Sequence, residues 1–422
     1  MEKIVSLCKR RGFIFQGSEI YGGLAGTWDL GHFGVALRNN IQQFWWKKFV
    51  DGRRDMYGID AALLMNSKVW EASGHVAGFA DPMVECKKCH HKFRADQVDG
   101  KCPDCGGEFG DIQQFNMMFK THIGASEDSS SVVYLRPETA QGMFVNFKNT
   151  VDAFHPKLPF GMAQIGKAFR NEIAPRDFIF RVREFEQMEI EYFIRPTDWE
   201  RYFEYWRGEM LEWMEEVGID MAKVHELEVL KEDRAHYSSR TIDFEFDFPF
   251  GKKELFGLAY RADFDLKSHG LDYIDEEKGE KTVPHVIEPT FGVGRALLAV
   301  LLSAYSEDEK DGEVRSYLKF KPNIAPVICA VSPLLKNKPE LVEYANIKVF
   351  APLKEEFGRV AWDDNGNIGK RYRRQDEIGT PFCIVVDFDT LTDDTVTVRD
   401  RDTGEQERIK VADLKDYIKE RI

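Results

Sequence analysis

Residues 169–193 read FRNEIAPRDFIFRVREFEQMEIEYF, a stretch that combines the period of a β-strand with an unusual amount of charge. Its apolar side chains recur at every second residue, which is the period of a half-buried strand. These residues are Phe178, Phe180, Val182, Met188, Ile190 and Tyr192. The pattern predicts two strands joined by a loop at Ala174-Pro175.

The second predicted strand has two different faces, because successive side chains of a strand point in opposite directions. One face carries Arg183, Phe185, Gln187, Glu189 and Glu191, and the other carries Glu184, Glu186, Met188, Ile190 and Tyr192. Neither face has the composition of a simple solvent-exposed surface. Together with Arg170 and Glu172 of the first strand, the polar row predicts a site built on a rigid sheet. A solvated, charged hairpin is the alternative.

The length of 422 residues allows two or three domains and a large core. The longest apolar run, ALLAVLLSAY from Ala296, is too short to span a bilayer, and the N-terminus MEKIVSLCKRRGF has no signal-type apolar segment. We therefore expect a cytoplasmic protein with no membrane partner. The net charge of −14 argues against a protein that coats nucleic acid by bulk attraction. From Lys321 onward acidic and basic residues nearly balance, so this part could meet a polyanion locally.

Four of the seven cysteines are grouped in VECKKCHHKFRADQVDGKCPDCGGEF. Cys86 with Cys89 and Cys102 with Cys105 form two Cys-x-x-Cys pairs. Each pair can direct two thiolates at one tetrahedral cation, so the spacing predicts a structural Zn²⁺ site. Redox-active or unrelated cysteines are the alternative. The adjacent histidines, His90 and His91, are expected at the surface, because four thiolates already complete such a site.

Helical spacing of apolar residues marks VALRNNIQQFWWKKFV, DWERYFEYWRGEMLEWMEEVG and RALLAVLLSAYS. The strand candidates SVVYLRP, TIDFEFDFPF and KELFGLAYRADFDL do not alternate regularly with helices, which predicts an antiparallel α+β core. Beyond several prolines, the apolar runs VICAVSPLL, IKVF, PFCIVVDFD and TVTVRD alternate with polar helical stretches. We expect a catalytic domain over residues 1–320 with a zinc-ribbon-like insertion at 84–110. A separate α/β domain is expected over 324–422.

Several of these segments together carry a family resemblance. They are YGGLAGTWDLGHFGVALRNNIQQFWW, LRPETAQGMF, AFRNEIAPRDFIFRVREFEQMEIEYF, ELFGLAYRADFDLKSH, EPTFGVGRALLAV and GKRYRRQDEIGTPFCIVVDF. The set resembles the homodimeric class II glycyl-tRNA synthetases, nearly over the whole chain and in the family's order. The resemblance implies a six- to seven-stranded antiparallel catalytic sheet and a C-terminal anticodon-binding domain. It also implies a homodimer that uses ATP, Mg²⁺ and glycine to charge tRNA(Gly).

The resemblance assigns an ATP site to residues of the opening stretch and beyond it. Attack of a carboxylate on the α-phosphate of ATP joins two anions, so catalysis depends on positioning and on charge neutralisation. Arg170 and Arg295 match the family's catalytic arginines, and Phe185 matches the aromatic residue on which adenine stacks. Further ATP contacts are implied for Asn171, Glu172, Arg181, Val182, Glu254 and Leu255.

Glycine has no side chain to recognise, so a site must bind its ammonium and carboxylate and exclude anything larger. Glu138, Glu189 and Glu288 match the family's glycine-pocket carboxylates, Thr290 matches a hydroxyl residue there, and Arg94 matches a substrate contact. Without the resemblance, Glu138 reads as a first-turn helix acid and Glu288 as an ordinary loop acid.

Two positions depart from the family pattern. His32 stands where the family usually has proline, which leaves the backbone of the dimer-forming segment undefined. Thr290 replaces the usual serine. The chain is also compact for the family.

A basic cluster, Lys370, Arg371, Arg373 and Arg374, lies in the C-terminal domain. The resemblance favours tRNA binding by this cluster, for which Arg371, Arg373 and Arg374 are the candidates. A solvated run of charge is the alternative.

Two other function classes share the architecture. A catalytically silent, synthetase-like subunit would bind nucleic acid without activating glycine, but Arg170, Phe185, Glu189 and Arg295 together argue against it. An enzyme for alanine, serine or proline would not need the three pocket carboxylates.

Overall fold

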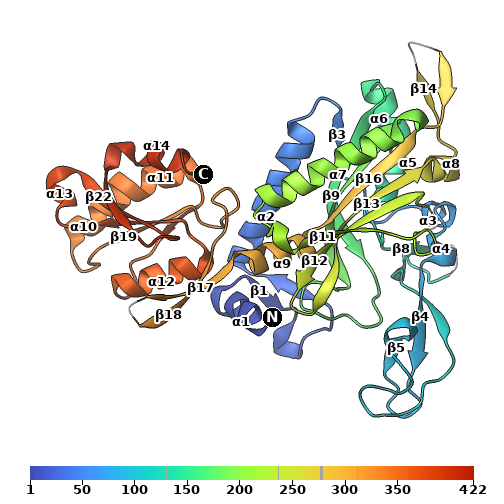
Figure 1. The fold of residues 1–422 in the computed structure, drawn as a ribbon, viewed down its shortest axis with the longest axis horizontal. Coiled ribbons are helices and arrows are strands. Elements are labelled where there is room, and N and C mark those ends of the chain that lie inside the picture. Colours follow the sequence, from blue (N-terminus) through green and yellow to red (C-terminus); the bar gives the residue numbers. More distant parts are fainter. Residues whose placement is uncertain (129–130, 236, 276–278, 311) are drawn as a thin grey trace.

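The computed structural model describes residues 1–128, 131–235, 237–275, 279–310 and 312–422. A seven-stranded sheet dominates the first three quarters of the chain (Figure 1), in the order β11-β12-β13-β16-β10-β9-β3. Its strands are β3 (Met56–Gly58), β9 (Phe160–Phe169), β10 (Glu184–Ile194), β11 (Val224–Glu228), β12 (Arg240–Phe248), β13 (Gly251–Ala262) and β16 (His285–Gly292). The predicted antiparallel sheet is confirmed for six strands, whereas the edge strand β3 runs parallel to β9. A long crossover separates β3 from β9 in the chain, which is what parallel pairing requires.

The loop between β9 and β10 is longer than the sequence pattern predicts. It runs from residue 170 to 183, so Phe178, Phe180 and Val182 lie in a loop and not in a strand. Asp177 and Phe178 have φ angles of 61° and 60°, left-handed conformations that interrupt an extended strand. The alternating apolar residues pack individually instead, and the ring of Phe178 meets Trp28 edge-on at 4.7 Å.

From Gln187 onward, strand β10 is buried on both faces. Met188, Ile190 and Tyr192 belong to the main hydrophobic core. Gln187, Glu189 and Glu191 point to the opposite face and are at most 5% exposed. The solvated-hairpin alternative is therefore wrong, and the sheet carries a buried polar face.

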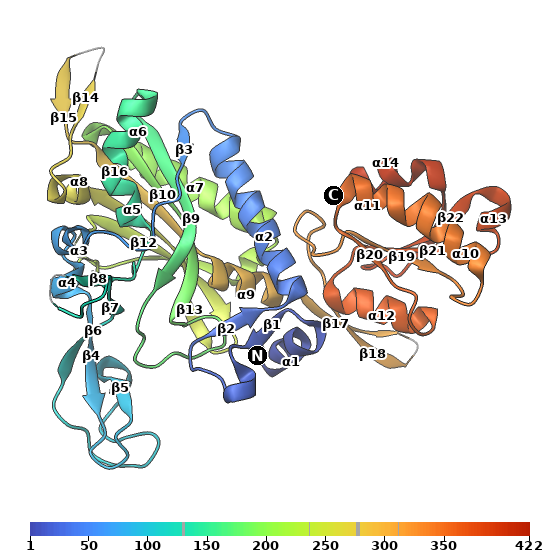
Figure 2. The same cartoon turned by 180° about the vertical axis from the view of Figure 1, so that it is seen from behind.

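Three predicted helices cover the apolar face of the sheet and are confirmed: α2 (His32–Trp46), α7 (Trp199–Glu216) and α9 (Val293–Ala304). Figures 1 and 2 show α7 lying across the strands on one side of the sheet. Helix α2 begins at His32, directly after Gly31 with its extended backbone (φ −77°, ψ −175°). The family's usual proline would also be favoured at this first helical position. Histidine at position 32 therefore leaves the start of the helix unchanged.

The other strand predictions are confirmed in outline. SVVYLRP contains β8 (Val132–Tyr134), TIDFEFDFPF contains most of β12, and KELFGLAYRADFDL divides between β13 and the short helix α8 (Phe264–Ser268). Smaller elements complete this part of the fold: α1 (Glu2–Arg11), β1 (Ile14–Gln16), β2 (Trp28–Leu30), α3 (Ser67–Ala72), α4 (His75–Gly78), β7 (Lys120–His122), α5 (Ala140–Val145), α6 (Phe147–Phe154), β14 (Tyr273–Asp275), β15 (Glu280–Thr282), β17 (Tyr305–Lys310) and β18 (Glu313–Leu318).

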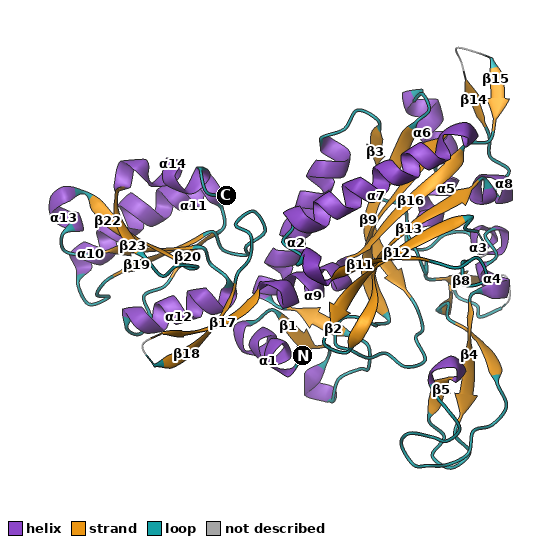
Figure 3. Cartoon of the chain, in the orientation of Figure 1, coloured by secondary structure: helices purple, strands orange, loops and turns teal. Residues whose placement is uncertain are grey.

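The cysteine-rich segment projects from the sheet as a separate lobe (Figures 1 and 3). Its three strands pair in the order β5-β4-β6. They are β4 (Ala80–Glu85), β5 (Lys92–Arg94) and β6 (Gln113–Asn116). This small lobe has little apolar core of its own.

The C-terminal region forms a five-stranded sheet, β20-β19-β21-β22-β23, with helices on it (Figure 3). Its elements are β19 (Cys329–Pro333), α10 (Pro339–Tyr344), α11 (Ala351–Phe357), β20 (Val360–Trp362), α12 (Ile368–Ile378), β21 (Phe382–Val386), α13 (Thr390–Asp393), β22 (Thr395–Asp400), β23 (Gln406–Lys410) and α14 (Leu414–Lys419). The predicted α/β organisation is confirmed. The run IKVF, however, lies in the helical turn Ala345–Phe350, where burial of Val349 explains its apolar character.

Packing separates two hydrophobic cores along the chain. Ile324, Ala325 and Val327 belong to the core of the large sheet, whereas the second core begins at Ile328. Ile378 is an exception, since it packs into the core of the large sheet. Among the described residues, none of the helices has the length and apolar character needed to cross a membrane.

Candidate active site

A pocket of about 270 Å³ opens on the polar face of the sheet, where β10, β13 and β16 meet the long loop after β9. Its lining comprises Arg94, Met117, Arg170, Glu172, Ile179, Phe180, Arg181, Val182, Phe185, Glu186, Gln187, Glu254, Leu255, Phe256, Thr290, Gly292, Gly294 and Arg295. Eight of the nine residues predicted to contact ATP are in this set. Asn171 is the exception, and its backbone N–H donates to the carbonyl of Met117 at 2.7 Å.

Arg170 lies between two aromatic rings at the edge of the pocket. Its guanidinium carbon is 5.3 Å from the centre of the Phe79 ring and 5.2 Å from that of Phe185. Its Nε donates to the carbonyl of Pro137 at 3.1 Å. These contacts hold the planar group while leaving its other nitrogens available for an anion.

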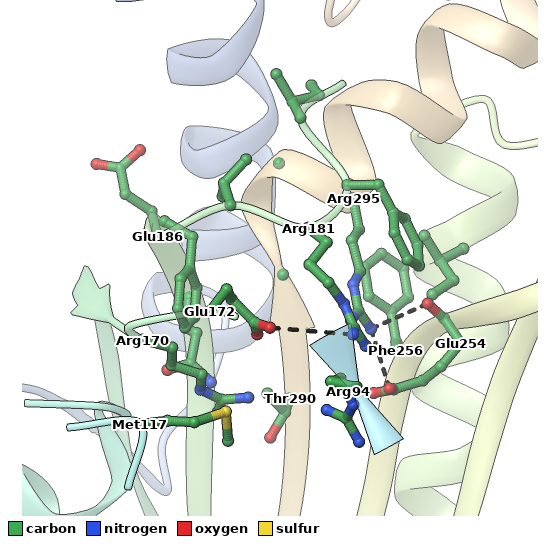
Figure 4. Close-up of a pocket in the computed structure, with 18 residues that line it drawn as sticks. Arg94, Met117, Arg170, Glu172, Arg181, Glu186, Glu254, Phe256, Thr290 and Arg295 are labelled. Carbon is green, nitrogen blue, oxygen red and sulfur yellow. Dashed lines mark hydrogen bonds and ion pairs between the residues drawn. The ribbon is translucent and has the colours of Figure 1, made fainter. Parts of the chain in front are cut away.

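Arg295 projects from the first turn of α9 on the opposite side of the pocket (Figure 4). It donates to the Glu254 carboxylate at 3.0 Å and lies over the ring of Phe180, 4.6 Å from its centre. The positive charge of Arg295 lowers the pKa of Glu254. The pair therefore presents a fixed guanidinium beside an aromatic ring.

Arg181 and Glu172 form a further pair across the pocket, with 3.9 Å between their charged atoms (Figure 4). Burial lowers the pKa of Arg181, while the charge of Glu172 opposes this effect. Arg94 also lines the pocket and is held by Asp81 and Asp96. Four arginines thus converge on one cavity, an arrangement suited to a polyphosphate.

Deeper on the same face, three buried carboxylates cluster. Oxygens of Glu189, Glu191 and Glu288 all lie within 4.8 Å of one another. One Glu189 oxygen accepts from Thr290 Oγ1 at 3.0 Å and the other from Thr139 Oγ1. Burial is the main cause that raises the pKa of all three carboxyl groups. Repulsion from a neighbouring carboxylate adds to it: from Glu138 for Glu189, from Glu288 for Glu191, and from Glu189 for Glu288. A concentration of buried negative charge of this kind favours a cationic ligand.

Arg261 is the cation nearest to Glu288. Its NH1 donates to Glu288 at 2.7 Å, and it makes a bidentate pair with Asp265 at 2.6 and 2.7 Å. Arg261 occupies a β-bulge in β13, because Tyr260 pairs with Ile287 while Ala262 pairs with Val286. A bulge changes the direction of a side chain, and here the guanidinium of Arg261 points into the site.

Glu138 stands just before α5, with two donors of its own. His75 Nε2 lies 3.3 Å from one oxygen, and Gln141 Nε2 donates to the other at 3.1 Å. Despite burial, the charges of His75 and Arg261 and these hydrogen bonds lower the pKa of Glu138. Gln141 also donates to Asp265 at 2.9 Å, which links Glu138 to the Arg261 pair.

The structure thus brings most of the predicted residues together and separates one of them. Glu138, Glu189, Glu288 and Thr290 lie around the carboxylate cluster, whereas Arg94 lies with the arginines of the pocket. Sequence reasoning missed the site roles of His75, Gln141, Phe180, Glu191, Arg261 and Asp265. A signal existed for Glu191, which shares the predicted face of Glu189, and for Arg261 with Asp265, which are four residues apart.

The cysteine pairs form one cluster at the tip of the small lobe, with all four sulfurs within 4.8 Å of one another. Cys86 and Cys105 sulfurs are 3.5 Å apart, and those of Cys89 and Cys102 are 3.6 Å apart. Thiolates at about 2.3 Å from a tetrahedral Zn²⁺ lie about 3.8 Å from each other, so the four residues fit the ion.

The two cysteine turns repeat the same backbone pattern. His90 N donates to Cys86 O at 2.9 Å, and Gly106 N donates to Cys102 O at 2.8 Å. At Gly107 an added Cβ would meet Cys86 Sγ at 2.9 Å, so only glycine leaves room for the sulfur. Both adjacent histidines are at the surface, as predicted.

The basic cluster of α12 is divided between the two faces of the helix. Lys370 and Arg373 are exposed. Arg371 is buried, and its guanidinium donates to the carbonyls of Pro333, Asp364 and Gly366. Arg374 pairs with Asp363. The structure therefore gives Arg371 a role inside the domain, and only part of the predicted tRNA-binding set faces outward.

Comparisons with known proteins agree with this architecture. Residues 119–305 match the family model "tRNA synthetase class II core domain (G, H, P, S and T)", and residues 328–421 match "Anticodon binding domain". Glycine–tRNA ligase of Caldanaerobacter subterraneus subsp. tengcongensis is 48% identical, over 100% of this chain and 98% of the relative. Those of Lachnospira eligens and Treponema denticola are 50% and 49% identical, over 100% of this chain and 98% and 97% of the relatives. The chain belongs to the glycine–tRNA ligase family.

In this member of the glycine–tRNA ligase family, the class II match contains the arginine pocket and the carboxylate cluster, apart from Arg94, Met117 and the segment that carries His75. The anticodon-binding match begins at residue 328, where the second hydrophobic core begins. The cysteine-rich lobe lies outside both matches. The alignment with the Caldanaerobacter relative spans 458 positions, so this chain of 422 residues is compact for its family.

Proposed function

We propose that this protein activates glycine with ATP and transfers it to the 3′ end of tRNA(Gly). The observation that carries the proposal is the adjacency of two opposite charge environments on one sheet face. An arginine-lined pocket suits ATP, and a buried carboxylate cluster beside it suits a small ammonium. Thr290 belongs to both, since it lines the pocket and donates to Glu189.

In the proposed reaction, the glycine carboxylate attacks the α-phosphate of ATP and pyrophosphate leaves. Arg170 binds the α-phosphate and the attacking carboxylate and stabilises the charge that develops in the transition state. Phe185 and Arg295 bind the two faces of adenine. Glu172 holds Arg181 in place and Glu254 holds Arg295 in place. Asn171, Val182 and Leu255 complete the ATP contacts.

Selection of glycine rests on charge and on space. Glu138, Glu189 and Glu288 receive the ammonium, and Thr290 fixes one Glu189 oxygen by its hydrogen bond. A larger amino acid would have to place its side chain among the buried carboxylates. An apolar side chain there offers these charges no hydrogen bond, so its binding is unfavourable. We propose Arg94 as a contact of the ATP pocket, because that is where it lies.

The remaining proposals concern the molecule around the site. We divide it into a catalytic domain up to Val327, which includes the zinc-binding lobe at 84–110, and an anticodon-binding domain from Ile328. Cys86, Cys89, Cys102 and Cys105 would hold one Zn²⁺, whose chemistry there is structural cross-linking. Lys370 and Arg373 are the proposed tRNA contacts of α12. Mg²⁺ with the ATP, a homodimer and a cytoplasmic location are proposed on family membership alone.

Amino-acid-dependent exchange of pyrophosphate into ATP tests the proposal. Purified protein should support exchange with glycine and much less with alanine, serine or proline at the same concentration. Charging of a tRNA(Gly) transcript should follow with glycine. Exchange that is equal for glycine and alanine would contradict the proposed pocket, and no exchange with any of them would contradict the proposed activity.

A further inference from the structure

One segment that precedes the cysteine-rich lobe reaches both parts of the active site. It spans residues 67–79 and contains α3 and α4. The ring of Phe79 lies against the guanidinium of Arg170, and His75 lies against Glu138. The segment also carries Ser73, which is 2% exposed.

Ser73, His75 and Glu138 form a buried chain of polar contacts. Ser73 Oγ lies 2.8 Å from His75 Nδ1, and His75 Nε2 lies 3.3 Å from Glu138 Oε2. A nitrogen that faces a carboxylate carries the proton, so Nε2–H donates to Glu138. The contact between Nδ1 and Ser73 Oγ orients the ring so that Nε2 faces Glu138.

The packing of the His75 ring against its aromatic neighbours does not use its nitrogen atoms. The ring is 5.5 Å from Trp70 and 5.3 Å from Phe79, contacts that a phenyl ring would also make. The polar partners of the ring are Ser73 and Glu138. A nitrogen at this position is therefore required by the carboxylate and not by the core.

Among the described residues, Glu138 in turn has one donor on each oxygen, His75 on Oε2 and Gln141 on Oε1. A carboxylate oxygen accepts more than one hydrogen bond, so both keep capacity for a further donor. The two donors orient the group and leave room on it for an ammonium.

We propose that His75 is a positioning residue of the glycine pocket. Its Nε2–H holds the Glu138 carboxylate in place, and Ser73 Oγ holds the His75 ring in the required orientation. This inference rests on the proposed function. It adds a residue outside the matched class II region, carried by the segment that leads into the cysteine-rich lobe.

The lobe supports the position of His75 through Asn116 at the end of β6. Asn116 Nδ2 donates to the carbonyls of His75 and Val76 at 3.2 and 3.0 Å. The backbone N–H of Met117 donates to the carbonyl of Phe79 at 3.0 Å. The segment is therefore fixed by the lobe on one side and contacts the site on the other.

The test compares His75→Gln with His75→Phe in pyrophosphate exchange, with glycine and ATP titrated separately. Glutamine can place a donor near the Nε2 position, whereas phenylalanine keeps only the ring. We expect His75→Phe to raise the KM for glycine about tenfold or more, because it removes a hydrogen bond to a charged group. The KM for ATP should stay within about twofold, and His75→Gln should recover most of the loss. Ser73→Ala should fall between wild type and His75→Phe.

His225 provides the matched control, because its Nε2 lies 2.8 Å from Asp247 in an exposed pair on β11 and β12. His225→Phe should leave both KM values unchanged. Equal glycine KM for His75→Phe and wild type, or parallel increases in both KM values for His75→Gln and His75→Phe, would overturn the inference. If His75→Phe does not fold, His75→Asn makes the same comparison, since its shorter amide does not reach Glu138. Absence of glycine-dependent exchange in the wild-type protein would instead refute the proposed function.

Discussion

Glu191 shows how strongly the active-site face departs from an ordinary protein interior. It is fully buried, and both of its carboxylate oxygens lack a hydrogen-bond partner among the described residues. One of its oxygens lies within 4.8 Å of an oxygen of Glu288 on the neighbouring strand. Burial and the nearby Glu288 raise its pKa well above the ordinary 4.5. A native structure keeps such a group at a cost, which is consistent with a functional site.

Replacement of Glu191 by methionine should therefore stabilise the protein, and more so at high pH. The folded state keeps the Glu191 proton to a higher pH than the unfolded chain does, so the contribution of this group to stability falls as pH rises above about 4.5. We expect Glu191→Met to raise the free energy of unfolding by about 1–3 kcal/mol at pH 8 and by less at pH 5. Thermal or urea denaturation of both proteins at the two pH values measures this, with Glu232→Met as an exposed control. A gain that is the same at both pH values would contradict the explanation.

Thr290 tests the hydroxyl of the pocket separately from its bulk. Thr290→Ser keeps the 3.0 Å hydrogen bond to Glu189, whereas Thr290→Val keeps the shape and loses the donor. We expect serine to retain glycine activation and valine to raise the KM for glycine about five- to tenfold, the effect of one lost hydrogen bond of about 1 kcal/mol or slightly more. Pyrophosphate exchange with glycine titrated measures both. Wild-type behaviour of Thr290→Val would show that this hydroxyl does not organise the pocket.

At the scale of residues, those that lie in family motifs could be predicted from the sequence. Residues whose position depends on packing could not. The arginines, Glu138, Glu189, Glu288 and Thr290 lie in motifs that the chain shares with its family. The role of Arg261 depends on a β-bulge, and that of His75 depends on how a separate segment folds back on Glu138. The burial of Arg371 could not be predicted, because its place on the inner face of α12 depends on the phase of a helix within a basic run.

At the scale of elements, the cysteine-rich lobe depends on its metal site. Its three short strands have little apolar core, so the two cysteine turns must be tied together by another interaction. We expect about one Zn²⁺ per chain in protein purified without chelator, and a lower melting temperature after the metal is removed. Elemental analysis and thermal denaturation measure these. Cys102→Ser should lower the zinc content and the melting temperature in the same way. A zinc content well under one per chain in the wild-type protein would contradict the assignment.

The elements themselves were predictable wherever one period extended over many residues. Helices α2, α7 and α9 and strands β10, β12 and β13 follow their hydrophobic patterns. The loop at 170–183 was not predictable, because left-handed conformations at Asp177 and Phe178 interrupt an alternation that otherwise reads as a strand. The run IKVF is apolar because it is buried, and four residues are too few to distinguish a strand from a helical turn.

At the scale of the whole molecule, the two hydrophobic cores assign different tasks to the two parts of the chain. The pocket and the carboxylates belong to the first part, and the exposed basic residues of α12 belong to the second. The parts are joined by a partly buried contact in which Arg10 and Arg11 of α1 pair with Glu377 of α12. The division predicts that tRNA charging can be weakened without loss of adenylate formation.

Substitution of Lys370 and Arg373 by alanine tests that division in the intact protein. We expect the KM for tRNA(Gly) to rise about tenfold at moderate salt, because two phosphate contacts are lost. Glycine-dependent pyrophosphate exchange should remain unchanged. The matched control is alanine at the exposed Lys336 and Lys338 of the same domain. Equal losses in charging and in exchange would show that α12 serves the fold or the chemistry instead of tRNA binding.

The most direct test of the account is the response of Glu189→Gln in pyrophosphate exchange, with glycine and ATP titrated separately. Glutamine keeps the shape of Glu189 and its contacts with Thr139 and Thr290 within reach, but it removes the charge proposed to bind the glycine ammonium. Loss of a charge-assisted contact costs about 1.5–3 kcal/mol, so glycine activation should fall about ten- to a hundredfold while the KM for ATP changes little. An increased KM for ATP with an unchanged dependence on glycine would contradict the carboxylate pocket.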